Sequence, residues 1–244
     1  MTVRLFSVIS AAALLAHVCF AQTYVLGTAD DSNKGYILDS VYPSLLNPNI
    51  PVSEFNSSAL TCRSLTIDDK FIPYPVVSGE PISLRYDNLT ISPMHNTNIT
   101  GPCTFWLADM KTKGNGASWF KIAQHLQTDG KWCTDVIQEG NGKAEFVYDL
   151  TIPDDIPSGT YYLRTEIIDL SANLDTGHRD FTRGPHFYVN CLPITVKGTG
   201  KITPVKYKIP GIYDNLEKKF IVNVENPGKF TIPGPPLYNA DVKV

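Results

Sequence analysis

The chain has 244 residues, of which 43% are hydrophobic and 18% are charged, and its formal net charge is −3. This balance excludes a disordered chain, and the length is enough for one sizeable domain. The sequence holds no run of lysine or arginine, which argues against a nucleic-acid-binding surface. The 17 glycines and 18 prolines follow no period, which excludes a collagen-like chain.

The N-terminal segment predicts the compartment. Arg4 precedes an apolar run that ends in small residues and is shorter than the roughly 20 residues of a membrane span, so we expect a secretory signal. The small-residue cleavage rule favours cleavage after Ala21, which gives a signal of residues 1–21 and a mature chain of residues 22–244. The alternative is cleavage after Ala16, which gives a signal of residues 1–16 and leaves His17 first.

Cysteines and glycosylation sequons also indicate a secreted protein. A mature chain without the longer signal keeps an even set of four cysteines, suited to two disulfides in an oxidising compartment, namely Cys62, Cys103, Cys133 and Cys191. A start at His17 keeps Cys19 as an odd fifth. Three N-glycosylation sequons are expected in surface turns, at Asn56, Asn88 and Asn98.

Short strings with a period of two follow one another along the chain. They are Pro81–Tyr86, Cys103–Leu107, Ala144–Leu150, Thr160–Ile168 and Phe187–Val196. Turn signals such as Ser78-Gly79 separate them, so the pattern predicts a sandwich or barrel of short strands around a shared core. Residues 30–51 and 170–184 are expected to be long loops. The proline-rich tail after Ile202 is expected to wrap over the body in extended form.

Several familiar hydrolytic and nucleotide sites are absent from the sequence. There is no Gly-x-Ser-x-Gly elbow, no phosphate-binding glycine loop and no His-Glu-x-x-His helix. The pairs Asp30/Asp31 and Asp154/Asp155 are adjacent residues, whereas glycoside hydrolysis needs two carboxylates facing each other across a cleft. We interpret both pairs as turn residues.

A set of longer strings carries a family resemblance. They are Ile50-Pro-Val-Ser-Glu-Phe up to Cys62, Trp119-Phe-Lys-Ile, Gly130-Lys-Trp, Ile152-Pro followed by Pro157-Ser-Gly-Thr-Tyr-Tyr-Leu-Arg-Thr-Glu-Ile-Ile, His186-Phe-Tyr-Val-Asn-Cys, Pro210-Gly-Ile-Tyr and Thr231-Ile-Pro-Gly-Pro. Together they resemble the fungal lytic polysaccharide monooxygenases of auxiliary activity family 9. The resemblance runs from about Pro51 to Tyr238 and keeps the order and spacing of the strings.

The resemblance implies a copper site and also shows where this chain departs from it. Members hold one copper ion through the amine and ring of an N-terminal histidine, a second histidine and an axial tyrosine, which Tyr188 matches. The second histidine falls on Ile99, which cannot bind copper. The family's outer histidine falls on Ser171, and its outer glutamine falls on His186. The copper site is therefore expected to be degenerate.

The remaining ligands depend on the mature N-terminus and on substitutes. Cleavage after Ala16 supplies the terminal chelate through His17, whereas a start at Gln22 supplies no ring ligand and can cyclise, which removes the amine. His95 lies in the same loop as Ile99 and is a candidate replacement ligand; His178 is interpreted as a polar loop residue. His186 shares a strand face with Tyr188, so it either hydrogen-bonds that tyrosine or binds metal.

The resemblance also implies two disulfides and a substrate contact. Cys62 and Cys191 match the family's bridge between the N-terminal region and a late strand, which leaves Cys103 and Cys133 for a second bridge if the chain starts after residue 21. Tyr213 matches a surface tyrosine that lies flat on the polysaccharide. The alternative for this tyrosine is that it packs the tail onto the body.

The sequence thus predicts a secreted, glycosylated, all-β protein with one domain. Its fold is expected to be an immunoglobulin-like or fibronectin-like antiparallel β-sandwich with long loops. The leading functional hypothesis is binding of cell-wall polysaccharide (cellulose or another β-glucan) or of a partner, by a monomer with a degenerate copper site and no nucleic acid or membrane partner. The alternatives are an active copper monooxygenase and a secreted effector that uses only the scaffold.

Overall fold

The computed structural model describes residues 51–62, 73–86, 99–140, 142, 146–171 and 185–239. Its helical elements are α2 (Ala59–Cys62), η1 (Met110–Thr112), α3 (Cys133–Glu139) and η3 (Glu217–Phe220). Its strands are β1 (Tyr74–Val77), β2 (Pro81–Arg85), β3 (Cys103–Asp109), β4 (Ala117–His125), β5 (Gln127–Thr128), β6 (Lys131–Trp132), β7 (Val147–Thr151), β8 (Gly159–Asp169), β9 (His186–Lys197) and β10 (Tyr207–Lys208).

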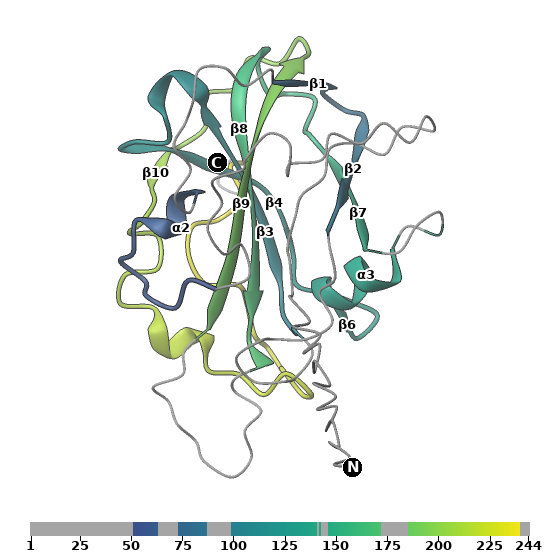
Figure 1. Cartoon of the computed structure of the whole chain (residues 1–244), viewed down its shortest axis with the longest axis vertical. Coiled ribbons are helices and arrows are strands. Elements are labelled where there is room, and N and C mark those ends of the chain that lie inside the picture. The colour runs from purple at the N-terminus through teal and green to yellow at the C-terminus, as the bar shows by residue number, and fades with distance from the viewer. Residues whose placement is uncertain are drawn as a thin grey trace, which may run out of the picture.

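A six-stranded sheet in the order β1-β9-β8-β3-β4-β10 forms the centre of the molecule (Figure 1). Strands β9, β8, β3 and β4 pair antiparallel, and the edge strand β1 pairs parallel with β9. The long pair β8–β9 keeps one register from Gly159 opposite Val196 to Asp169 opposite His186. The five strings with period two all overlap strands, so those strand predictions are confirmed.

One face of this sheet packs against the two-stranded sheet β2–β7. Alternate residues of every strand point to this side, because successive side chains of a strand face opposite ways. Fully or almost fully buried residues from both sheets make this first core, among them Leu84, Phe105, Leu150, Leu163 and Ile194. The two layers form the predicted all-β sandwich, which is confirmed.

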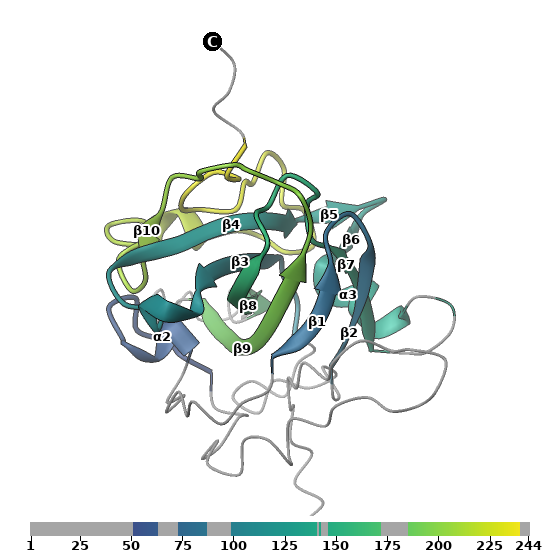
Figure 2. The same ribbon diagram turned by 90° about the horizontal axis from the view of Figure 1, so that it is seen from above.

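The other face of the sheet is covered by α2 and by the C-terminal tail. Figure 2 shows the tail, in yellow-green, crossing above β4 and beside β10. The tail contributes six buried residues to this second core, namely Ile209, Ile212, Tyr213, Phe220, Val224 and Ile232. The prediction that the proline-rich tail wraps over the body is therefore confirmed.

Two disulfides fix helices to the sheet. Cys62 at the end of α2 is bonded to Cys191 on β9, and Cys103 on β3 is bonded to Cys133 at the start of α3. Both pairs are those that the resemblance implied.

Gly79, in the turn between β1 and β2, has a φ of 83°, a conformation that glycine adopts without steric cost. None of the helices in the described part of the chain is long and apolar enough to cross a bilayer.

Candidate functional site

The position expected for copper lies at the end of β8, where the segment before β3 returns to the sheet. The Ile168 amide donates to the Pro102 carbonyl at 2.9 Å, and the Leu170 amide donates to the Thr100 carbonyl at 2.8 Å. Gly101 lies so close that a Cβ atom there would be 1.9 Å from the Ile168 carbonyl oxygen. Only glycine allows this approach of the two backbones.

Asp169 connects this segment to the neighbouring strand. Its Oδ1 accepts hydrogen bonds from the Ser171 amide at 2.9 Å and from the Thr100 amide at 3.2 Å. Across the β8–β9 pair, Asp169 lies opposite His186, which is 4% exposed. Tyr188, two residues further along β9, is buried in the first core, and strand alternation puts both side chains on the same face. The structure thus brings Ser171, His186 and Tyr188 to one end of the sandwich.

Ile99 is the residue that the resemblance places at the second-ligand position. Its side chain is fully buried and belongs to the same apolar core as Tyr188. An aliphatic side chain offers no electron pair to a metal, and copper sites of this type need imidazole nitrogen. Within the described ranges, His, Cys, Asp and Glu side chains form no group of three or more that could hold a metal ion. Among the described residues, the position that the resemblance gives to the second histidine therefore offers copper no ligand.

Other predicted positions lie outside the described residues. They are both cleavage points, after Ala16 and after Ala21, the candidate ligands His17 and His95, the loop residue His178, and the sequons at Asn88 and Asn98. The choice between a chain cut after Ala16 and one cut after Ala21 stays open, and with it the role of His17 as a ligand. The roles of the other residues stay predictions as well.

Tyr213 is where the structure contradicts the prediction of a surface residue. Its side chain is 1% exposed, and its ring stacks on Phe187 with a centroid distance of 5.2 Å and an interplanar angle of 18°. Phe220 packs edge-on against the same ring at 5.2 Å. A ring enclosed in this way cannot lie flat on a polysaccharide, so the predicted stacking role is wrong. The alternative, that Tyr213 packs the tail onto the body, is confirmed.

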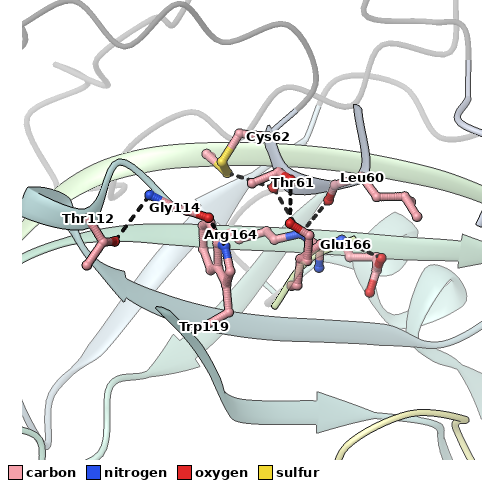
Figure 3. The surroundings of a disulfide bond; sticks show 10 residues. Leu60, Thr61, Cys62, Thr112, Gly114, Trp119, Arg164 and Glu166 are labelled. Carbon is pink, nitrogen blue, oxygen red and sulfur yellow. Dashed lines mark hydrogen bonds and ion pairs between the residues drawn. A yellow bond between two sulfur atoms is a disulfide. The ribbon is translucent and has the colours of Figure 1, made fainter. Parts of the chain in front are cut away.

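The hydroxyl of Tyr213 belongs to a buried polar network that the sequence did not predict. Its hydroxyl donates to Glu166 Oε2 at 2.6 Å, and Thr104 donates to the same oxygen at 2.6 Å. Arg164 Nη2 lies 2.6 Å from Glu166 Oε1, and both side chains of this ion pair have no exposed surface. Arg164 Nε also donates to the Leu60 carbonyl of α2, next to the Cys62 disulfide (Figure 3).

The charges of this network alter two pKa values. Burial alone raises the pKa of Glu166, but the Arg164 charge and three donated hydrogen bonds outweigh it, and the pKa lies below its ordinary value. Burial, followed by the Glu166 charge, raises the pKa of the Tyr213 hydroxyl well above its usual range. The carboxylate is therefore ionised and the tyrosine is neutral at neutral pH.

A buried lysine adjoins the network. Lys121 on β4 is 1% exposed, its Nζ lies 5.2 Å from the Trp106 ring centroid, and it donates to Gln124 Oε1 at 3.0 Å. Burial lowers its pKa from 10.5 to about 8, partly offset by attraction to Glu166. The only sequence signal for these charges is their placement at inward positions of strands.

Comparison with known proteins gives the family. The sequence model of Auxiliary Activity family 9 (formerly GH61) matches residues 17–231. AA9 family lytic polysaccharide monooxygenase D of Geotrichum candidum is 32% identical over 199 residues, which are 79% of this chain and 57% of that protein. Monooxygenase AA9-X282 of Trametes coccinea is 26% identical over 247 residues, 93% of this chain and 81% of that protein. The chain thus spans little more than half of the Geotrichum relative.

Solved structures agree on the fold. The extended catalytic domain of H. jecorina LPMO9A superposes with a TM-score of 0.64 at 23% identity, over 89% of this chain and 80% of that one. The cellulose-active polysaccharide monooxygenase of M. thermophila gives a TM-score of 0.59 at 24% identity, over 78% and 83%. These similarities show that the chain shares the β-sandwich fold of these structures. The chain belongs to Auxiliary Activity family 9.

Proposed function

We propose that this chain binds cell-wall polysaccharide, cellulose or a related β-glucan, and that its copper site is degenerate, so that it does not cleave the polysaccharide efficiently by oxidation. The family's named relatives are lytic polysaccharide monooxygenases, which supports a polysaccharide as the ligand. The observation that carries the proposal is Ile99, a fully buried aliphatic residue at the second-ligand position.

Copper titration of the natively secreted protein tests the degenerate site. We expect no Cu²⁺ site tighter than about micromolar by calorimetry, because one of the two imidazoles is missing. We also expect no oxidised oligosaccharides from cellulose with a reductant and saturating copper, and retention of the protein on insoluble cellulose. Tight copper binding together with oxidised products would refute the proposal.

A second candidate is an active copper monooxygenase that uses His17, its amine, Tyr188 and a replacement ligand such as His95 or His186. The family match that begins at residue 17 favours it, because a mature chain cut after Ala16 presents the terminal histidine. The intact mass and N-terminal residue of the secreted protein separate the two candidates. A free His17 is required for the enzyme, and a start at Gln22 removes the terminal chelate.

We further propose that the protein is secreted, glycosylated and monomeric. Asn56 lies exposed in a turn that precedes α2, where a glycan has room. A fall in mass after removal of N-glycans, and its loss in the variant Asn56→Gln, checks this site.

A further inference from the structure

An asparagine-glycine pair lies in the turn between η1 and β4. Both residues of the pair, Asn115 and Gly116, are exposed. The backbone of this turn has a positive φ at Lys113 (52°), Gly114 (70°) and Gly116 (64°), and glycine adopts such angles without steric cost. The turn therefore presents the pair to solvent on an irregular piece of backbone, outside any strand or helix.

The amide of Gly116 can reach the side chain of the preceding residue. Within the described part of the chain, neither the Gly116 amide nor the Asn115 side chain takes part in a hydrogen bond. A Cβ atom built on Gly116 would meet nothing within 4 Å, so the space beside the amide is open. The nitrogen is thus available as a nucleophile, and there is room for it to close a five-membered ring onto the side chain.

The other exposed asparagines lack at least one of these conditions. The amides that follow Asn56 and Asn215 each donate to a backbone carbonyl, at 3.2 and 3.0 Å. Asn223 accepts two amide hydrogen bonds through its Oδ1. Asn226 precedes a proline, whose nitrogen carries no hydrogen. Among the exposed asparagines that are followed by a described residue, Asn115 alone combines an unbonded side chain with an unbonded glycine amide.

We infer that Asn115 is a site of spontaneous deamidation. The Gly116 nitrogen attacks the side-chain carbonyl carbon of Asn115 and forms a C–N bond, the bond to the side-chain nitrogen breaks, and that nitrogen leaves with the amide proton as ammonia. Water then opens the resulting succinimide at either carbonyl and gives aspartate or isoaspartate. No atom is oxidised or reduced, and the product carries one more negative charge than the asparagine.

The isoaspartate product alters a turn that packs on the second core. The Gly114 carbonyl accepts a hydrogen bond at 3.0 Å from Nε1 of Trp119, whose ring is fully buried (Figure 3). Isoaspartate adds one carbon to the backbone between these two residues, so we expect the hydrogen bond to weaken and the urea midpoint to fall. The turn follows the Asp109 end of β3, which pairs with Tyr161 near the start of β8. The expected copper position lies at the other end of β8, so deamidation leaves it unchanged.

Peptide mapping of the full mature protein, aged at mildly alkaline pH, tests the inference. After reduction, trypsin releases Asn115 in a peptide of residues 114–121, Asn215 in residues 209–218, and Asn223 with Asn226 in residues 220–229. We expect the first peptide to convert to aspartate and isoaspartate forms, detected by mass and by methyl transfer from an isoaspartate-specific methyltransferase, while the other two stay unchanged. The second asparagine-glycine pair, Asn141-Gly142, falls in a separate peptide, residues 132–143.

A pair of glycine variants tests the role of the amide. Gly116→Ala keeps the asparagine and places a methyl group beside the reacting nitrogen, so we expect conversion of residues 114–121 to slow by about tenfold or more. The matched control is Gly130→Ala, in another turn, where φ is 78° and a built Cβ also meets nothing within 4 Å. This control should convert at the rate of wild type.

A synthetic peptide of residues 113–117 gives the rate without the fold, and we expect the native protein to react within about tenfold of it. This comparison needs no variant to fold. A native protein that stays unconverted while the free peptide reacts would overturn the inference, as would equal conversion of residues 220–229 or an unchanged rate in Gly116→Ala. The inference does not rest on the proposed function, since copper titration and retention on cellulose are measured separately, so the failure of either leaves the other standing.

Discussion

Glu166 is the residue whose charge organises the second core. It is fully buried and accepts hydrogen bonds from Arg164, Thr104 and Tyr213. A buried ion pair contributes little net stability compared with an apolar pair, yet removal of one partner leaves the other charge without compensation. The network is therefore more sensitive to single substitutions than to its complete replacement.

The variant Glu166→Gln tests this sensitivity. It keeps the shape of the side chain but leaves the Arg164 guanidinium buried without a counter-charge, so we expect a loss of about 3–5 kcal/mol in the free energy of unfolding. Urea denaturation measures it. Glu139→Gln, which breaks the exposed pair with Lys131, is the control and should leave the urea midpoint unchanged. A Glu166→Gln protein as stable as wild type would contradict the buried-charge argument.

Tyr213→Phe distinguishes a packing role from a substrate role. The variant keeps the stacked ring and removes only the donor to Glu166, and a hydrogen bond to a charged group is worth about 1.5–3 kcal/mol. We expect that loss in urea denaturation and unchanged retention on cellulose. A variant with the stability of wild type and reduced retention on cellulose would instead support a role of Tyr213 in contacting the polysaccharide.

Lys121 makes stability depend on pH in the alkaline range. Its folded pKa of about 8 lies below the ordinary 10.5, so between these values the unfolded chain binds more protons and stability rises with pH. The raised pKa of Tyr213 acts in the opposite direction only above about pH 10, where the unfolded tyrosine ionises. The contribution of Lys121 to the pH dependence of stability is therefore best measured between about pH 7.5 and 9.5.

The comparison with Lys121→Met isolates this contribution. Between about pH 7.5 and 9.5 the stability of wild type should rise by about 2 kcal/mol relative to the variant, from roughly 1.36 kcal/mol per pKa unit. Urea denaturation at both pH values provides the difference. A constant or falling difference would mean that the lysine does not lose its proton in the folded chain.

At the scale of elements, alternation identified the strands because each strand of the main sheet buries one or both faces. The string Thr160–Ile168 lies within β8, and Phe187–Val196 lies within β9. Alternation alone could not say what covers each face. The strand pattern around Trp119 predicts a core residue. For Tyr213 the sequence supports a surface ring and a buried ring equally. Its hydrogen-bond partner Glu166 is distant in sequence, and a buried glutamate is not expected from the sequence.

The disulfide between Cys62 and Cys191 links α2 to β9. Its two cysteines are separated by 129 residues, so in the chain-entropy model the cross-link contributes about 5 kcal/mol. We expect Cys62→Ala/Cys191→Ala to lose a stability of that order, measured by urea denaturation under oxidising conditions. The pair Cys103 and Cys133 closes a shorter loop of 30 residues, and its double alanine variant should lose about 4 kcal/mol. The reverse order would contradict the loop-length argument.

At the scale of the whole molecule, the family could be named from sequence because its strings keep order and spacing along most of the chain. The state of the copper site could not be settled in the same way. The resemblance places Ile99 where a ligand is expected, but the other ligands depend on whether the signal is cut after Ala16 or after Ala21, and on a loop that alternation does not constrain.

The tail also completes the hydrophobic core of the molecule. A chain that ends at Ile212 lacks Tyr213, Phe220 and Val224 and leaves apolar surface of the main sheet uncovered. We expect this truncated protein to aggregate and to bind the dye ANS. A chain that ends at Asn239 keeps every residue that packs on the described sheet and should behave as wild type. A soluble, dye-negative truncation at Ile212 would show that the tail is dispensable for the core.

The path of the tail has a consequence for how the protein is made. Near the end of the described residues, Tyr238 donates its amide to the Lys121 carbonyl and its hydroxyl to Asp155, so this segment is bonded to parts of the chain that are synthesised well before it. A nascent chain cannot close its second core until Phe220, Val224 and Ile232 have been synthesised, and the sheet face that they cover is exposed in the meantime. Shielding of this sheet face while the tail is being synthesised should therefore affect the yield of folded protein.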